Sequence, residues 1–220
     1  MTERPPFPAE AFRRYDESPD AGFYAAARLV THIDDGAIAA VTQLYREYVP
    51  AGGDFLDLMS SWVSHLPPEV EYGLVVGLGM NREELEANPR LNDGVVQDLN
   101  RDPHLPFADE TFDAAGICVS IQYLTQPADV LREVGRVLKP GGSIVITYSN
   151  RCFPTKAVAI WQALDDRAHG VLVERYLLDA GNWEEITWLD RSPGGGDPLY
   201  AVVARNRAIP ATRRGGRSLS

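Results

Sequence analysis

The most informative segment of this 220-residue chain runs from residue 104 to residue 150. Residues 112–119 form an almost continuous apolar run, which is typical of a strand covered on both faces. Residues 128–138 place apolar side chains at helical spacing, and a Lys-Pro-Gly-Gly turn then precedes a second apolar run at 143–148. Strand, helix, turn and strand in this order predict one half of an open α/β sheet.

The rest of the chain extends this sheet in both directions. Three short apolar runs upstream and two downstream have the length and composition of strands, and the last two are joined by a Pro-Gly-Gly-Gly-Asp-Pro turn that indicates an antiparallel hairpin. We therefore expect strands at 54–58, 72–78, 94–98, 183–189 and 199–204, and helices at 81–87 and 154–169.

The N-terminal quarter divides into a polar lead and two helical patterns. Residues 1–20 are polar and proline-rich, which predicts a flexible lead. Apolar side chains then recur at helical spacing from Phe23 to Tyr48, with a break near residues 32–36 where either Asp34 or Asp35 would cap the second helix. No internal repeat is found, so residues 21–204 are expected to form a single domain.

Charge and cysteine content exclude several classes of function. Residues 205–220 hold five arginines and no acid, so the remaining chain carries 16 basic and 31 acidic side chains. Such a body repels phosphate backbones and argues against a nucleic-acid substrate. The end of the chain is predicted to be a basic disordered tail, with a nucleic-acid-binding arm as the alternative. Cys118 and Cys152 fit neither a disulfide framework nor a metal site, and no apolar run is long enough to span a membrane, so a cytoplasmic protein is expected.

The order of motifs in residues 104–150 resembles the class I S-adenosylmethionine-dependent methyltransferases, in particular the type 11 methyltransferase domain. The resemblance rests on Leu-Pro-Phe at 105–107, Phe-Asp at 112–113, the apolar strand, the helix, and Leu-Lys-Pro-Gly-Gly at 138–142. It implies a Rossmann-like doubly wound sheet of about seven strands that ends in an antiparallel β-hairpin. It also implies a helical lid over residues 21–50, S-adenosyl-L-methionine as cofactor, and a small-molecule methyl acceptor.

The resemblance places the cofactor loop directly after the strand at 54–58. The family has Asp-x-Gly-x-Gly-x-Gly there, whereas this chain has a degenerate loop that reads Asp57-Leu58-Met59-Ser60-Ser61-Trp62. Asp57 is expected to hold the cofactor ammonium, and the serines, at the start of a helix, its carboxylate. The alternative is that these residues only cap that helix.

A second departure concerns the ribose. The acid that the family carries at the end of its second strand is replaced by Gly79, so Asn81, Glu83, or backbone and water would have to take its place. Asp98 resembles the aspartate that accepts from the adenine amino group. The cofactor residues that the resemblance implies are Asp57, Met59, Ser60, Ser61, Trp62, Gly79, Met80, Asn81, Asp98, Leu99, Ser120, Gln122 and Tyr123.

Two histidines are candidates for a general base, which is needed only where the acceptor arrives protonated. His65 follows the serine loop, and His32 lies between the two N-terminal helical patterns. Tyr24, Arg28 and His32 stand at i, i+4 and i+8, so a helical lid would present them to the acceptor on one face; a solvated face is the alternative. His104 is expected to be structural, and His169 to lie on the surface at a helix end.

Two other functions remain open on the sequence. A non-catalytic module with the same fold would explain the altered loop. An NAD-linked reductase would use Gly77-Leu78-Gly79, although Arg82 stands where its third glycine belongs. The methyl acceptor, its reacting atom, the use of a base, and the choice between monomer and homodimer are not determined. No metal ligands and no nucleic-acid or membrane partner are predicted.

Overall fold

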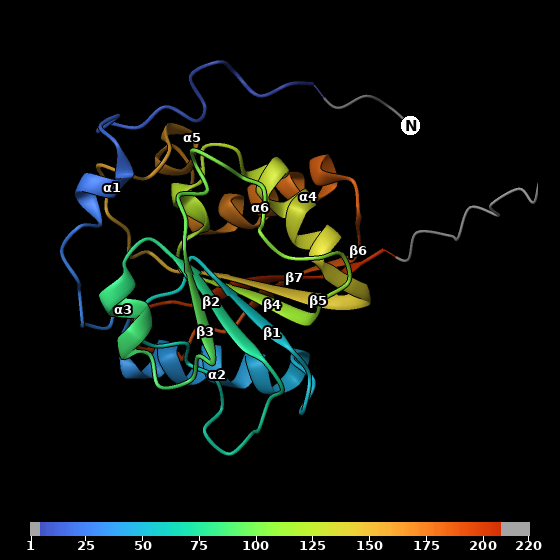
Figure 1. Ribbon diagram of the computed structural model, residues 1–220. Helices are drawn as coiled ribbons and strands as arrows, with labels where there is room; N and C mark the ends of the chain where they lie inside the picture. The colour runs from blue at the N-terminus through green and yellow to red at the C-terminus, as the bar shows by residue number, and fades with distance from the viewer. Residues whose placement is uncertain (1–4, 208–220) are drawn as a thin grey trace, which may run out of the picture.

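Seven strands form one mixed sheet in the computed structural model, which describes residues 5–207 (Figure 1). The strand order is β3-β2-β1-β4-β5-β7-β6; the first five strands are parallel, and β7 runs antiparallel to both of its neighbours. This confirms the α/β class and the terminal hairpin. The strands are β1 (Phe55–Leu58), β2 (Val75–Gly79), β3 (Asp93–Val96), β4 (Phe112–Cys118), β5 (Leu138–Tyr148), β6 (Trp183–Asp190) and β7 (Tyr200–Asn206).

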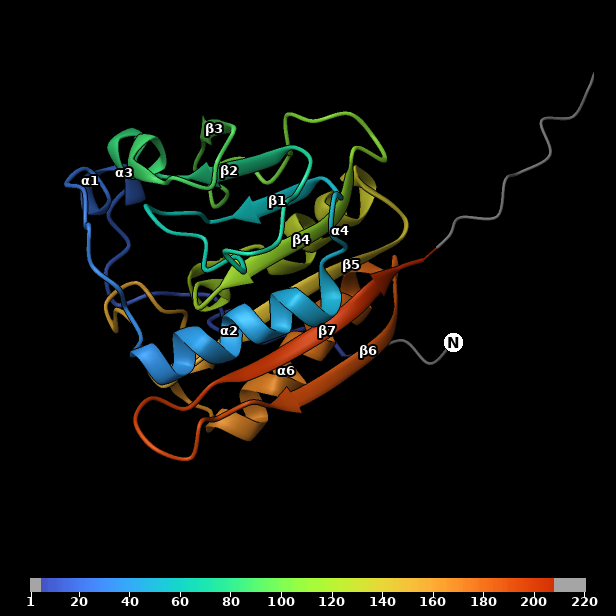
Figure 2. The ribbon, with the colours of Figure 1, turned by 90° about the horizontal axis from the view of Figure 1, so that it is seen from below.

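Helices cover both faces of this sheet. α2 (Asp35–Tyr48) lies on one face, while α4 (Pro127–Val137) and α6 (Asp166–Ala180) lie on the other (Figures 1 and 2). The short helices α1 (Asp20–Phe23) and α3 (Arg82–Ala87) stand beside the edge where the parallel strands end. The remaining helical turns are η1 (Ile121–Tyr123) and α5 (Ala159–Gln162).

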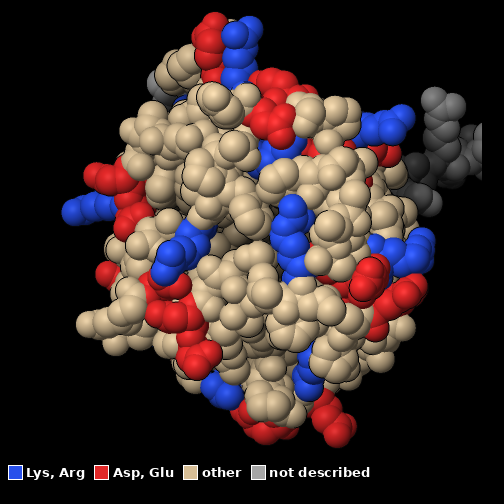
Figure 3. All heavy atoms as spheres, turned by 90° about the vertical axis from the view of Figure 1, so that its left-hand side faces the viewer, with Lys and Arg blue, Asp and Glu red and all other residues tan. Residues whose placement is uncertain are grey.

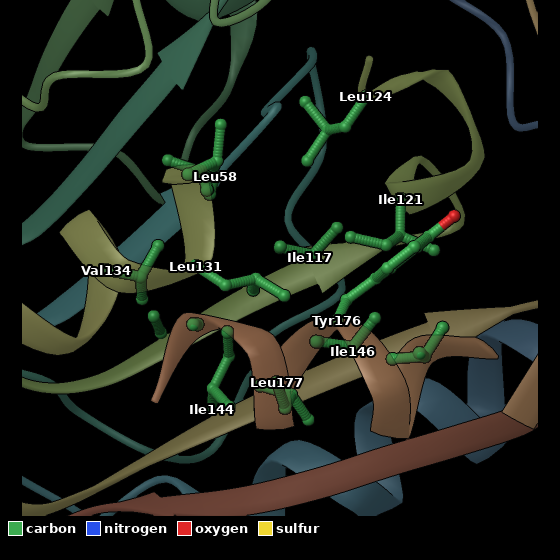
Figure 4. Close-up of a cluster of buried hydrophobic side chains, with 14 of the residues drawn as sticks. Leu58, Ile117, Ile121, Leu124, Leu131, Val134, Ile144, Ile146, Tyr176 and Leu177 are labelled. Carbon is green, nitrogen blue, oxygen red and sulfur yellow. The ribbon is translucent and has the colours of Figure 1, made fainter. Parts of the chain in front are cut away.

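The larger core lies between the sheet and the pair α4 and α6 (Figure 4). The helical spacing of apolar residues in α4 turns Leu131 and Val134 toward the strands, where both are fully buried. Burying one such side chain contributes roughly 1.5–3 kcal/mol. The main strand and α6 partners are Leu58, Ile117, Ile144, Ile146, Tyr176 and Leu177.

The connection from β1 to β2 contains no helix. Residues 59–74 cross from one strand to the next as irregular chain, so the helix expected after the cofactor loop does not form. Two residues in it, Met59 and His65, have positive φ angles of 57° and 51°, which a right-handed helix does not allow. Pro67 and Pro68 interrupt the segment further along.

The predicted helix over residues 23–30 is wrong. α1 ends at Phe23, and the chain from Tyr24 to Ile33 is irregular. Its backbone acceptors are used by tertiary contacts: Nδ2 of Asn81 donates to the carbonyl oxygens of Tyr24 and Ala25. Of the two N-terminal helical patterns, the second forms as α2 with Asp34 as its N-cap, and it packs on the sheet instead of forming part of a lid.

The N-terminal lead lies against the domain from residue 5 onward. The rings of Phe7 and Phe12 pack on Tyr176 of α6, with centroid distances of 5.8 and 5.9 Å. The Ile160 amide donates to the Ala11 carbonyl at 2.9 Å. Residues 7–12 therefore make packing and hydrogen-bond contacts with the domain that the expectation of a flexible lead did not include. At the other end, Arg205 belongs to β7 and Arg207 donates to the Trp183 carbonyl, whereas Arg213, Arg214 and Arg217 lie outside the described residues.

The region after β5 also differs from the prediction. The chain forms α5 and α6 where one helix over 154–169 was expected, because Asp165 caps a new helix by accepting from the Ala168 amide at 2.9 Å. His169 therefore lies inside α6 and is only 6% exposed, stacked on Trp161, and not on the surface. Within residues 5–207, no helix has the length and hydropathy that crossing a bilayer requires.

Candidate functional site

A cavity of about 310 Å³ opens at the carboxyl ends of the parallel strands. Figure 3 looks onto this edge of the sheet, where a hollow opens among mostly uncharged side chains. An open α/β sheet binds its ligands at this edge. The walls come from six segments, namely residues 20–33, 57–65, 78–84, 97–100, 118–124 and 151–153.

The structure gathers nearly all the predicted site residues around this cavity. The exception is Gln122, whose side chain is 1% exposed and turns back to donate from Nε2 to the Val119 carbonyl at 2.9 Å. Residues that line the cavity as predicted are Tyr24, Arg28, His32, Asp57, Met59, Ser60, Ser61, Trp62, His65, Gly79, Met80, Asn81, Asp98, Leu99, Ser120 and Tyr123.

Asp57 organises the loop after β1. The hydroxyl groups of Ser60 and Ser64 both donate to its Oδ2, each at 2.6 Å. Asn88 continues the network by donating from Nδ2 to the Ser64 hydroxyl and the Ser61 carbonyl. Burial raises the pKa of Asp57 to about 6, and the two serine hydrogen bonds only partly offset it. The Ser60 and Ser64 hydroxyls are thus hydrogen-bonded to Asp57. Residues 59–74 contain no helix whose N-terminal amides could bind a ligand.

Gly79 lies in close contact with the same loop. The Ser60 amide donates to the Leu78 carbonyl at 2.8 Å, which holds the loop against the end of β2. A Cβ on residue 79 would overlap the Ser60 carbonyl oxygen. Position 79 therefore requires glycine, and no ribose-binding side chain can stand there.

The two residues expected to replace that acid lie in different surroundings. Asn81 caps α3 with its Oδ1 and donates from Nδ2 to residues 24 and 25, so its side chain is fully engaged. Glu83 is exposed and does not line the cavity. Glu84, which the sequence analysis missed, is 9% exposed and does line it, and its Oε1 accepts from the Arg28 amide at 2.7 Å.

Two further polar groups line the cavity from the ends of β3 and β4. The Asp98 carboxylate accepts from the Asn100 amide at 3.0 Å, which fixes it at the end of the third strand. The Ser120 hydroxyl is buried and has no hydrogen-bond partner among the described residues. A buried hydroxyl without a partner costs free energy, and a ligand in the cavity would satisfy it.

Aromatic rings form the outer wall. Tyr123 and Phe153 stack with centroids 5.9 Å apart, and Tyr123 Oη accepts from the Phe153 amide. The Arg28 guanidinium lies 4.6 Å from the Phe23 ring centroid and 5.6 Å from that of Phe153. A cation among aromatic faces is stabilised by their quadrupoles, so Arg28 is held in place beside the cavity.

His32 and His65 enter the cavity from different segments. The His32 ring meets the Phe153 ring edge-on at 5.4 Å, and His65 belongs to the irregular loop. Desolvation lowers the pKa of each imidazole, which favours the neutral form that can accept a proton. His104 lies elsewhere, 69% exposed and paired with Glu133, which agrees with a structural role.

A buried charge cluster beside the cavity was also missed. Asp20 accepts two hydrogen bonds from the Arg14 guanidinium at 2.7 and 2.8 Å and a third from Asn100. Lys156, which is fully buried, lies 3.2 Å from Asp20 and 3.1 Å from Asp16. These pairs join the N-terminal lead to the loop after β5. Nothing in the sequence indicated this charge cluster, because Lys156 is a single lysine in an Ala- and Val-rich stretch.

These groups match the polar parts of S-adenosylmethionine. The cofactor carries an ammonium, a carboxylate, a ribose diol and an adenine amino group. Asp57 at the end of β1, Glu84 on α3 and Asp98 after β3 offer three carboxylates, and the partnerless Ser120 hydroxyl offers a fourth polar contact. A dinucleotide fits less well, because α3 after Gly79 has only six residues and its cap is taken by Asn81.

Comparison with known proteins agrees with this match. A family model described as "Methyltransferase domain" matches residues 62–146. The demethylmenaquinone methyltransferase of Paenarthrobacter aurescens is 31% identical over 73% of this chain and 71% of its own length. That of Streptomyces griseus is 29% identical over 77% of this chain and 84% of its own.

Solved structures share the fold at lower identity. The S-adenosylmethionine-dependent methyltransferase of Mesorhizobium loti superposes on 76% of this chain and 98% of its own, with a TM-score of 0.55 and 17% identity. This likeness concerns the fold alone. Family model, sequence relatives and site geometry agree, and the chain belongs to the class I S-adenosylmethionine-dependent methyltransferases.

Proposed function

We propose that the protein methylates a small phenolic acceptor of the quinol type, with His32 or His65 as the base. The observation that carries this proposal is the pair of imidazoles lining one cavity whose outer wall is aromatic. A phenolic hydroxyl is protonated at neutral pH and needs such a base, whereas its ring needs flat apolar walls.

The cofactor would lie across the strand ends. Asp57 is assigned to the ammonium, Asp98 to the adenine amino group, and Ser120 to the methionine end. When bound, S-adenosylmethionine supplies an electrophilic methyl group on its sulfonium sulfur. The protein's own part is to hold the acceptor in line with that methyl and to exclude water from the cavity.

The acceptor would enter between the aromatic wall and the two histidines. Tyr123 and Phe153 would pack on the ring face, and His32, edge-on to Phe153, would accept the phenolic proton. The resulting negative charge would be stabilised by Arg28, which is fixed nearby by its contacts with Phe23. A ring activated in this way is nucleophilic at carbon as well as at oxygen. Attack at carbon would form the new C–C bond as the S–CH3 bond breaks with S-adenosylhomocysteine as leaving group, and loss of the ring proton at that carbon, with the phenolic oxygen reprotonated, would restore the quinol.

Two observations favour a quinol over other phenols as the methyl acceptor. The relatives that match most of this chain are named demethylmenaquinone methyltransferases. In addition, Val30 lines the mouth of the cavity with 58% of its surface exposed, and Trp62 lies beside it, donating from Nε1 to the Val30 carbonyl. An apolar rim of this kind would accommodate an apolar substituent on the ring.

The test is a methyl-transfer assay with a short-chain demethylmenaquinol kept reduced, followed by mass spectrometry of the quinol and of S-adenosylhomocysteine. We expect one added methyl group on the ring. Catechol and an aliphatic amine serve as comparison acceptors. Turnover of the amine but not of the quinol would contradict the proposal.

Calorimetric titration with S-adenosylhomocysteine separates this function from the non-catalytic alternative. An enzyme of this family binds the product of its cofactor, and we expect a saturable heat of binding. Absence of heat and of any thermal shift at millimolar ligand would favour a module that has lost the cofactor.

A further inference from the structure

We infer that Glu84 takes the place of the missing ribose-binding acid and couples cofactor binding to the N-terminal segment that lines the cavity. This inference rests on the proposed cofactor site. It concerns a residue five positions beyond the one where the family carries its acid, on α3 instead of on β2.

The usual position is closed by the backbone itself. The loop after β1 crosses the end of β2, and the Ser60 carbonyl oxygen stands where a side chain of residue 79 would begin. An acid for the ribose must therefore reach the cavity from elsewhere. α3 begins three residues after Gly79 and is the next element along the cavity wall.

Among the acids of α3, only Glu84 faces the cavity. Glu83 and Glu86 are exposed and lie outside the lining, whereas Glu84 is 9% exposed and belongs to it. Burying a carboxylate is costly unless it is paired or hydrogen-bonded, so a glutamate in this position requires an explanation.

The hydrogen bonds of Glu84 show that it is not used for capping. Asn81 and Glu84 have the spacing of a capping box, in which the glutamate would accept from the backbone amide of the N-cap residue. Here Asn81 caps the helix by accepting from the Glu84 amide at 3.1 Å, but the Glu84 carboxylate turns away and accepts from the Arg28 amide at 2.7 Å through Oε1. No donor among residues 5–207 contacts Oε2. One carboxylate oxygen thus remains for a ligand.

The contact with Arg28 connects the carboxylate to the acceptor side of the cavity. The Arg28 side chain donates to the Phe23 carbonyl and packs against the rings of Phe23 and Phe153. Glu84 also acts electrostatically on His32, whose pKa it raises against the larger lowering effect of burial. A diol that fixes the Glu84 carboxylate would therefore also fix the segment from residue 28 to residue 32.

The test compares E84Q with E83Q, a matched change on the exposed neighbour. Glutamine keeps the Oε1 acceptor for the Arg28 amide, removes the charge, and replaces the free Oε2 acceptor with an NH2 donor. Calorimetry with S-adenosylhomocysteine and with its 2′-deoxy and 3′-deoxy analogues measures what each ribose hydroxyl contributes. A hydrogen bond to a charged group contributes about 1.5–3 kcal/mol, which corresponds to roughly 10- to 100-fold in the dissociation constant.

We expect E84Q to bind S-adenosylhomocysteine about 10- to 100-fold more weakly than the wild type. In the wild type, removal of at least one hydroxyl should weaken binding by a similar factor, and E84Q should lose most of this discrimination. E83Q should match the wild type with all three ligands.

A purely structural role for Glu84 predicts a different result, in which E84Q weakens binding of all three ligands by the same factor, and that result overturns the inference. Equal affinity of E84Q and wild type overturns it as well. Neither outcome contradicts the proposal that the protein methylates a quinol. Conversely, a wild type that shows the discrimination but does not methylate quinols contradicts only the proposed acceptor.

Discussion

The carbonyl oxygen of Ser60 occupies the space that a side chain on residue 79 would need, so the loop after β1 is fitted against the end of β2. The same loop donates its Ser60 amide to the Leu78 carbonyl and its Ser60 hydroxyl to Asp57. Three contacts at one serine thus hold the two strand ends together under the cavity. Changes to either strand end are expected to affect the other.

Gly79→Ala is therefore expected to destabilise the protein by about 1–3 kcal/mol, the usual cost of overpacking. The blocking atom is a backbone oxygen and cannot rotate away. Urea unfolding followed by circular dichroism measures the change. Gly22→Ala is the control, because a Cβ at residue 22 has open space around it. Equal stability of the two variants would show that the loop yields easily.

Binding of S-adenosylhomocysteine is expected to depend on pH through Asp57. Burial raises the pKa of this carboxyl to about 6 in the free protein, so it is partly protonated at pH 6. A ligand ammonium favours the ionised form and lowers that pKa, so binding releases a proton and affinity rises with pH from 5 to 7 by about tenfold. Calorimetry in buffers of different ionisation enthalpy counts the proton. Asp57→Asn should bind more weakly and remove this pH dependence.

The catalytic base can be identified by comparing His32→Gln with His65→Gln. General-base catalysis contributes typically about 10²- to 10⁴-fold, so kcat for the quinol should fall by that range in one variant. Because desolvation lowers the imidazole pKa, the wild-type rate should rise with pH with a midpoint below that of an ordinary imidazole, and the variant should lack this rise. Affinity for S-adenosylhomocysteine should change little. Unchanged kcat in both variants would mean that no imidazole takes the proton.

Lys156→Met is expected to destabilise the protein by about 3 kcal/mol or more, because it leaves buried carboxylate and carbonyl groups without their cation. Lys156 is fully buried and contacts Asp16, Asp20 and the Ser18 carbonyl. Lys139→Met is the matched control. Lys139 pairs with Asp113 but is 42% exposed, so its loss should cost under about 1 kcal/mol. Similar unfolding midpoints for the two variants would argue against a stabilising role for the buried cluster.

The sheet could be predicted from the sequence because each strand is a short apolar run between turn residues. In the βαβ unit, β4 and α4 formed as expected from their apolar spacing, whereas β5 begins already at Leu138, so that the predicted Lys-Pro-Gly-Gly turn is an irregularity within that strand. The helix over 23–30 failed because Asn81, more than fifty residues away, binds the carbonyl groups of Tyr24 and Ala25. Periodicity within a short window carries no information on such contacts.

The candidate site could be predicted where the family motif showed which strand of the fold each segment corresponds to, and less well elsewhere. Counting strands placed Asp57, Asp98 and Ser120 at the cavity, although no local property of those residues marks them. Glu84 was missed because its spacing from Asn81 is that of an ordinary helix cap. Asp20 was missed because its importance arises from its pairing with Arg14, six residues away, and with Lys156, which the fold brings from beyond β5.

The irregular crossover from residue 59 to residue 74 has a consequence for how the empty protein behaves. Its backbone lacks the continuous series of amide hydrogen bonds that protects a helix such as α4 from exchange. We therefore expect faster deuterium uptake there than in α4. A bound donor that contacts Asp57 would slow this uptake selectively. In this chain, part of the rigidity that a helix usually gives to the methyl-donor pocket would then be supplied by the donor itself.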